Sequence, residues 1–365
     1  MALRCGIVGL PNVGKSTLFN SLSSAKAQAA NFPFCTIEPN VGVITVPDAR
    51  LNQLSDLVQP ERIVPNTIEI VDIAGLVKGA SKGEGLGNQF LANIRDTNAI
   101  IHVIRCFEDA NVVHVDGSVN PVRDKEIIDY ELQLKDLETV DKRLDRAQKL
   151  IKSGDKLAQR MVDLLKRLKS HLEEGRSARA MDFTQEELED VRDLHLITLK
   201  PVLYVANVDE HSVIDGNEFS QQLKEAISGE QAEMILISAK IESEIAELAD
   251  PEERKEYLAM YGLTEPGVNR LIRAAYNLLK LITYFTAGKK EVRAWPVKAG
   301  STAPQAAGVI HTDFEKGFIR AEVIKFKDYL ELKSENACKE AGRLKLEGKE
   351  YKVEDADVMH FRFNV

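Results

Sequence analysis

The stretch Arg4-Cys5-Gly6-Ile7-Val8-Gly9-Leu10-Pro11-Asn12-Val13-Gly14-Lys15-Ser16-Thr17 decides the fold of this chain. It begins as a short apolar strand, continues as G-x-x-x-x-G-K-S and opens a helix. Gly9 and Gly14 allow a tight turn whose N–H groups point at phosphate oxygens, and the helix dipole favours negative charge there. Lys15 is expected to reach the β- and γ-phosphates and the Ser16 hydroxyl to bind Mg²⁺. The pattern predicts an α/β domain that binds a purine nucleoside triphosphate.

Composition sets broad limits on what the chain can be. Its 365 residues predict two or three domains, and 44% hydrophobic with 29% charged residues is typical of a globular protein. Its four cysteines are scattered singly, and neither a signal peptide nor a membrane-spanning run is present, so we expect a cytoplasmic protein with no membrane partner. The net charge of −9 argues against a surface that coats nucleic acid, although it permits a local basic patch.

Two further segments are expected to complete the phosphate site. The loop from Asn31 to Asn40 contains a single threonine, Thr36, placed where nucleotide switches bring a threonine to Mg²⁺ and the γ-phosphate. The strand 67–71 delivers Asp72 at its carboxyl end, and Gly75 follows in the pattern D-x-x-G. We expect Asp72 to hold Mg²⁺ through water and the Gly75 N–H to contact the γ-phosphate.

The catalytic group is the least determined part of the site. Ras-type enzymes place a glutamine after this glycine, but Leu76 stands here and can neither donate nor accept a hydrogen bond. Hydrolysis must therefore use another group or remain slow. His114 lies in a polar loop after the strand 99–105 and is the candidate for positioning the water, the alternative being an ordinary loop histidine. His102, inside that strand, is predicted to be a core residue.

From about Tyr130 the sequence is a long segment that is rich in charged residues and poor in glycine. Apolar residues recur at spacings of three and four, and Ser153-Gly154-Asp155 interrupts them, so we predict an antiparallel helical hairpin over residues 129–195. The pattern Thr184-x-x-Glu187 predicts a capping box that opens another helix, through about Leu194. The hairpin also carries enough basic residues to form one basic side: Lys149, Lys152, Lys156, Arg160, Lys166, Arg167 and Lys169.

The segment expected to read the base departs from the GTPase pattern. GTPases carry Asn-Lys-x-Asp after a buried strand, and the aspartate accepts hydrogen bonds from guanine N1–H and the exocyclic amine. Here the sequence is Asn207-Val208-Asp209-Glu210, with Glu210 one methylene longer than aspartate. Ser238-Ala239-Lys240 resembles the loop that flanks the base in GTPases. These residues alone leave the choice between ATP and GTP open.

The last part of the chain differs in composition from the segments before it. A helix is predicted over residues 271–281, and the strand-like segments 291–297 and 318–324 follow it. We therefore expect residues 282–365 to form a compact α+β module, and residues 1–128 with 196–281 to form the nucleotide-binding domain.

These motifs together resemble the YchF or Obg-like ATPase family over the whole chain, on the segments 9–17, 31–40, 72–80 and 303–320. The resemblance implies a Ras-like domain interrupted by a helical hairpin and followed by a TGS domain of the β-grasp type. It also implies an ATPase that evolved from GTPases. By position, the residues from Asn12 through Val13, Gly14, Lys15 and Ser16 to Thr17 would bind the triphosphate. Asn207 and the Val208 backbone would bind the adenine.

The resemblance also suggests cofactors and partners. Asn12 matches the asparagine of potassium-activated relatives, which makes K⁺ a candidate beside Mg²⁺. Family members associate with ribosomes or RNA and with stress responses. The leading hypothesis is a Mg²⁺-dependent ATPase switch coupled to ribosomes. The alternatives are a GTPase with relaxed base specificity and a nucleotide-gated binding protein whose hydrolysis is incidental.

Overall fold

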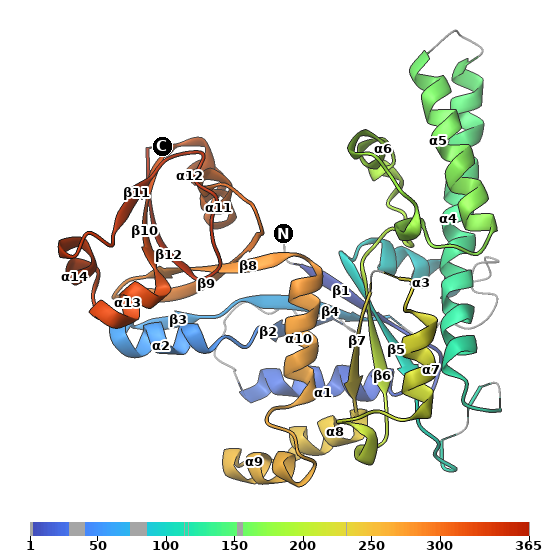
Figure 1. Cartoon of the computed structure of the whole chain (residues 1–365), viewed down its shortest axis with the longest axis horizontal. Helices are drawn as coiled ribbons and strands as arrows, with labels where there is room; N and C mark the ends of the chain where they lie inside the picture. The colour runs from blue at the N-terminus through green and yellow to red at the C-terminus, as the bar shows by residue number, and fades with distance from the viewer. Residues whose placement is uncertain are drawn as a thin grey trace. The chain divides into compact units, whose positions relative to one another are not determined.

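A computed structural model describes residues 3–28, 41–73, 86–112, 114–115, 117–151, 156–230 and 232–364. The chain forms two compact units, one from residues 1–44 with 69–275 and the other from residues 45–68 with 276–365. Each unit is built on its own six-stranded sheet. Figure 1 shows the elements of both units.

The sheet of the first unit follows the order β2-β4-β1-β5-β6-β7, and β4, β1, β5, β6 and β7 pair in parallel. The core strands are almost wholly apolar, as parallel strands covered on both faces require. The strands are β1 (Arg4–Val8), β2 (Val41–Thr45), β4 (Thr67–Asp72), β5 (Ala99–Arg105), β6 (Val202–Asn207) and β7 (Glu233–Ile237).

The helices of this unit are α1 (Lys15–Gln28), α3 (Leu86–Arg95), α4 (Pro121–Ile151), α5 (Lys156–Glu173), α6 (Gln185–Asp190), α7 (Glu218–Ala226), α8 (Ala239–Glu247), α9 (Pro251–Met260) and most of α10 (Gly267–Leu278). Short 3₁₀ turns occupy Ala178–Ala180, Arg192–Leu194 and Glu210–Ser212. Among the helices that the structure describes, none is long and apolar enough to cross a bilayer.

The register of the sheet gathers the predicted motifs at one edge. Ile7 pairs with Asp72, Val8 with His102, Arg105 with Asn207, and Asn207 with Ile237. The carboxyl ends of these strands therefore meet where the phosphate loop and the base-reading segment begin, as in other open parallel sheets.

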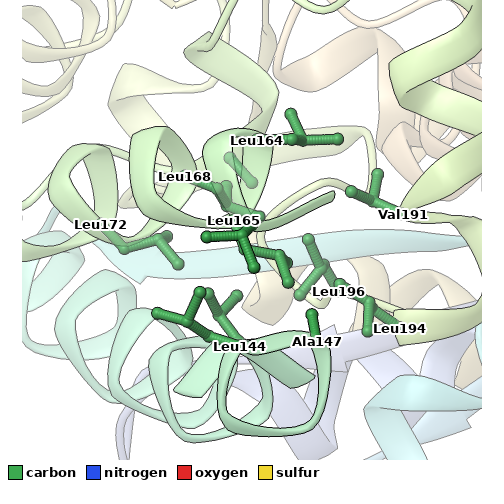
Figure 2. Close-up of a cluster of buried hydrophobic side chains, with 12 residues drawn as sticks. Leu144, Ala147, Leu164, Leu165, Leu168, Leu172, Val191, Leu194 and Leu196 are labelled. Carbon is green, nitrogen blue, oxygen red and sulfur yellow. The ribbon is translucent and has the colours of Figure 1, made fainter. Parts of the chain in front are cut away.

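Helices α4 and α5 lie side by side as the predicted hairpin (Figure 1). In Figure 2, leucines of α5 lie opposite Leu144 and Ala147 of α4, and the returning chain adds Val191, Leu194 and Leu196. This cluster is separate from the sheet and gives the arm a small core of its own. Helix α4 begins at Pro121, earlier than the predicted hairpin boundary at residue 129.

The second unit contains a sheet of order β11-β10-β12-β8-β9-β3. Its central pair β12·β8 is parallel. The pairs on either side, β8·β9 on one and β10·β12 with β10·β11 on the other, are antiparallel, which is the β-grasp arrangement. Its elements are α2 (Ala49–Val58), β3 (Arg62–Val64), β8 (Leu281–Ala287), β9 (Glu291–Lys298), α11 (Ala303–Ile310), α12 (Thr312–Lys316), β10 (Phe318–Lys325), α13 (Phe326–Leu332), α14 (Glu335–Glu340), β11 (Lys345–Glu347) and β12 (Asp357–Phe363).

Residues 45–68 are an unexpected part of the second unit. The buried face of α2, formed by Leu51, Leu54 and Val58, packs with Phe285 and Val292 of the sheet. Strand β3 pairs in parallel with β9, from Arg62 opposite Glu291 to Val64 opposite Arg293. The compact units thus divide the chain differently from the predicted domains, which assigned this segment to the nucleotide-binding domain.

Two predicted helix ends were wrong. The helix expected over residues 271–281 ends at Leu278, because Lys280 takes a left-handed conformation with φ of 53° and Leu281 already starts β8. The helix opened by Thr184 has the predicted capping box, but it stops at Asp190 and a 3₁₀ turn follows it to Leu194.

Candidate nucleotide-binding site

The phosphate loop joins β1 to α1 as its sequence predicts. Asn12 has φ of 60° and Gly14 has φ of 91°, so the loop contains two left-handed residues before the helix opens at Lys15. Ser16 and Thr17 lie exposed in the first turn of α1, whereas Val13 is buried. These two left-handed residues give the loop the tight turn that the sequence predicts before the helix.

Lys15 meets Asp72 at the centre of the site. Its Nζ lies 3.1 Å from Asp72 Oδ1, and both side chains are largely shielded from solvent. The two halves of the predicted phosphate machinery, separated in sequence, are therefore adjacent in space. Thr36, Gly75 and Leu76, the other residues predicted for this part of the site, lie outside the described residues.

Asn207 ties the phosphate loop to the base-flanking loop. Its Nδ2 donates to the Val13 carbonyl at 2.8 Å, and its Oδ1 accepts from the Ala239 N–H at 2.9 Å. Val208 donates its own N–H to the Ile237 carbonyl at 2.9 Å, and the Ser238 hydroxyl caps α8. Because this N–H is engaged, the predicted contact of the Val208 backbone with adenine would have to use the Val208 carbonyl oxygen.

Both carboxylates of the base-reading segment are engaged. Asp209 accepts from the N–H groups of His211 and Ser212, at 3.0 and 3.1 Å, and from the Ser212 hydroxyl at 2.8 Å. Burial would raise the pKa of Asp209, but these hydrogen bonds outweigh it and hold the pKa low. Glu210 pairs with Lys240, which lowers the pKa of the Glu210 carboxyl.

His114 is buried rather than open to the loop around it. Its Nε2 lies 2.8 Å from Asp124 Oδ2 in the first turn of α4, and Asp124 Oδ1 accepts from the Arg123 guanidinium at 2.9 Å. His102 is a buried core residue, as predicted. Burial first, and then the charges of Lys125 and Arg179, lower the pKa of His102 to about 3.

Sequence reasoning missed the roles of three side chains that shape this site. Arg105, at the end of β5, is 2% exposed and donates to the carbonyls of Phe107, Asp109 and Val112, so it fixes the loop that leads to His114. The others are Asp124, which holds His114, and Lys240, which holds Glu210. An aspartate in the first turn of a helix close after His114 was a usable signal for Asp124. No pattern in the sequence distinguishes Arg105 or the pairing of Lys240.

Similar proteins are known over the whole length of this chain. A family profile described as 50S ribosome-binding GTPase matches residues 4–151, and the C-terminal profile of the YchF GTPases, described as a protein of unknown function, matches residues 281–364. A curated protein of Escherichia coli named ribosome-binding ATPase YchF is 56% identical over 365 residues, with all of both chains covered. The chain belongs to the YchF family.

Other members of the YchF family extend the comparison. The Bacillus subtilis protein of the same name is 55% identical over 367 residues, with all of both chains covered. The solved YchF GTPase of Schizosaccharomyces pombe is 38% identical and superposes with a TM-score of 0.89, covering 99% of this chain and 97% of that one. The predicted family and the predicted fold are therefore confirmed.

Proposed function

We propose that this chain is a slow, Mg²⁺-dependent switch that hydrolyses ATP to ADP and phosphate, prefers ATP over GTP, and works with the ribosome. The full-length relatives from Escherichia coli and Bacillus subtilis are named ribosome-binding ATPases. That name is also the basis for proposing a cytoplasmic location, since ribosomes work there. Links to RNA outside the ribosome or to stress-response proteins rest on the family resemblance alone.

The proposed preference for ATP over GTP rests on the pairing of Glu210 with Lys240. Guanine presents N1–H and an exocyclic amine, both donors, so a site for guanine needs an available carboxylate. Asp209 is committed to its own turn and Glu210 to Lys240, so a guanine would have to displace one of these bonds. Adenine has no such pair of donors and needs no carboxylate. The base-reading segment therefore favours ATP.

A GTPase with relaxed specificity is the second candidate. The bonds from Asn207 to Val13 and Ala239 maintain a GTPase-like base loop, and the Glu210–Lys240 pair is exposed enough to open. Equilibrium competition of ATP and GTP for the nucleotide-free protein, with Mg²⁺ present and in K⁺ or Na⁺, separates the two. Preference for ATP supports the proposal, and preference for GTP overturns it.

We propose that Ser16 and Asp72 hold Mg²⁺, with Thr36 completing the set. Across the described ranges, there is no cluster of three or more His, Cys, Asp or Glu side chains that could hold a metal alone. The donors beside Lys15 are one hydroxyl and one carboxylate, which suits an ion that keeps several waters and binds mainly to phosphates. Bound there, Mg²⁺ would neutralise charge that develops on the phosphates. Asn12 is the proposed K⁺ ligand.

We further propose that His114 positions the attacking water in place of the missing glutamine, and that Asp124 orients its imidazole. The 2.8 Å contact between His114 Nε2 and Asp124 Oδ2 supports a fixed ring orientation. His114→Ala should lower turnover by about tenfold or more, an order-of-magnitude figure for the loss of a positioned group. Nucleotide affinity should change little.

The matched control for His114→Ala is His360→Ala, which replaces an exposed histidine on β12. Unchanged turnover in His114→Ala would remove His114 from the mechanism. Asp124→Asn should preserve the packing and shift the pH dependence of turnover, whereas a purely structural role for Asp124 would change stability without moving the pH profile.

The third candidate function, that of a nucleotide-gated binding protein, is tested by a different experiment. Cosedimentation with ribosomes is measured for the parent chain, for Lys15→Ala and for His114→Ala. If Lys15→Ala abolishes ribosome binding while His114→Ala retains it, binding depends on the nucleotide and hydrolysis is secondary.

A further inference from the structure

The loop between β5 and α4 contains His114, and its first residue is fastened to the base-reading segment. The Cys106 N–H donates to the Asn207 carbonyl at 2.8 Å. The Cys106 carbonyl accepts from Asn217 Nδ2 at 2.7 Å, and the same Nδ2 lies 3.3 Å from Asp209 Oδ2. The loop therefore starts at a point that is fixed relative to the residues predicted to read the base.

Arg105, the last residue of β5, fixes the following part of the same loop. Its Nε donates to the Phe107 carbonyl at 3.1 Å, its NH1 to the Val112 carbonyl at 2.9 Å and its NH2 to the Asp109 carbonyl at 3.3 Å. The guanidinium also lies 4.7 Å from the centroid of the Phe107 ring. Within the loop, the Val112 N–H donates to the Asp109 carbonyl at 3.2 Å. One side chain thus holds the backbone before and after this turn.

The chemistry of Arg105 indicates that the shape of the loop is what it provides. The residue is 2% exposed, and the three acceptors are neutral backbone carbonyls rather than carboxylates. Burying a cation is costly, and an apolar side chain would fill a buried position at less cost if packing alone mattered. A guanidinium, however, presents several donors in one rigid plane and can hold several carbonyls in a single arrangement.

The far end of the loop is fastened to α4. His114 is buried, and its Nε2 lies 2.8 Å from Asp124 Oδ2. Arg105 therefore holds the backbone that leads to His114, whereas Asp124 holds the imidazole itself. Both are needed to place a catalytic group, because a displacement of about 1 Å can cost roughly 10²-fold in rate.

We propose that Arg105 is a positioning residue for ATP hydrolysis. Its guanidinium holds the loop so that the His114 imidazole stays where it can orient the attacking water. Arg105 acts through His114 and takes no part of its own in the chemistry. This inference therefore rests on the role proposed above for His114.

The test is a double-mutant cycle in the full chain. Arg105→Met keeps an unbranched side chain and removes every donor, so kcat should fall by about tenfold while KM for ATP changes by less than about twofold. In the His114→Ala background the same substitution should lower kcat by less than about twofold, because the group that Arg105 positions is already absent. Arg105→Lys keeps a donor and should retain part of the turnover. It replaces Arg105→Met in the cycle if that variant fails to fold.

The matched control is Arg179→Lys, at a largely buried arginine of the first unit that donates to the Thr198 carbonyl and to Glu230. This control should leave kcat unchanged. Three results would overturn the inference and leave the role of His114 intact: losses that add fully in the double variant, a loss confined to KM, or equal losses in Arg179→Lys and Arg105→Lys. Unchanged turnover in His114→Ala alone would refute the proposed role of His114, and the inference with it.

Discussion

Gly14 is required by its neighbours as well as by its backbone. A Cβ at this position would lie 2.2 Å from Asn207 Nδ2, and the residue has φ of 91°. Gly14→Ala should therefore displace the Asn207 amide from the Val13 carbonyl and lower nucleotide affinity by about tenfold or more, equivalent to 1.4 kcal/mol. Isothermal titration measures the change.

The control for Gly14 isolates backbone strain from the clash. Gly300 has φ of 84°, and an added Cβ would meet no atom within 4 Å. Gly300→Ala should therefore cost only the strain of a left-handed residue, roughly 1–2 kcal/mol of stability, and should leave nucleotide affinity unchanged. Equal losses of affinity in both variants would contradict the contact-based account.

His102 gives the folded chain a sensitivity to acid. Its pKa is about 3 when folded, below the ordinary value of 6.5, because burial and the nearby charges of Lys125 and Arg179 disfavour its charged form. Between these values the unfolded chain binds the proton and the folded chain does not, so this contribution to stability is present above about pH 6.5 and declines as the pH falls.

Replacing His102 with a neutral side chain should remove that dependence. From about pH 7 to about pH 5 the parent should lose about 2 kcal/mol of unfolding free energy through this group, and His102→Phe should lose correspondingly less. Denaturant titrations at the two pH values measure both. Identical losses in parent and variant would show that His102 is not responsible.

At the level of elements, Asp136 fastens helix α4 to the chain that returns from the hairpin. It is fully buried and accepts from the N–H groups of Ile197 and Thr198, at 2.8 and 2.7 Å, and from the Thr198 hydroxyl at 2.6 Å. Asp136→Ala leaves three buried donors without their acceptor and should cost about 3 kcal/mol or more. Thermal unfolding measures the loss.

An exposed pair on the same arm provides the comparison. Asp141→Ala breaks only the bond with Lys169, and its effect should stay within about 0.5 kcal/mol. If the two aspartates cost the same, burial would not be the reason for the importance of Asp136.

The sequence predicted elements well where one local rule applied. The capping box of Thr184 is formed, and the strand over residues 99–105 has the predicted bounds. The sequence-based prediction failed where an element depends on pairing with a partner that is distant in the chain. Nothing near Arg62 indicates that it starts a strand, because that strand exists only by pairing with β9. Similarly, the basic side of the hairpin was visible in the sequence, but the ion pairs of Arg160 and Arg167 with carboxylates of α6 were not.

For the molecule as a whole, the two compact units should lose structure separately. Leu54 of α2 is fully buried with the sheet of the second unit, and Leu22 of α1 is fully buried in the first. Leu54→Ala should destabilise by about 2–5 kcal/mol and increase hydrogen exchange in β8 and β9, with β1 and β5 protected. Leu22→Ala should produce the opposite pattern. Increased exchange in β1 and β5 of Leu54→Ala would mean that α2 belongs energetically to the first unit.

The placement of residues 45–68 has a consequence for biosynthesis. Chains are made from the amino terminus, so α2 and β3 leave the translating ribosome long before the strands of residues 276–365 that cover them. During that interval the face of Leu51, Leu54 and Val58 has no partner among the strands of its own sheet. Assembly of the second unit is therefore postponed until the end of translation, and a nascent chain stalled before residue 276 would expose an apolar surface open to chaperones and proteases.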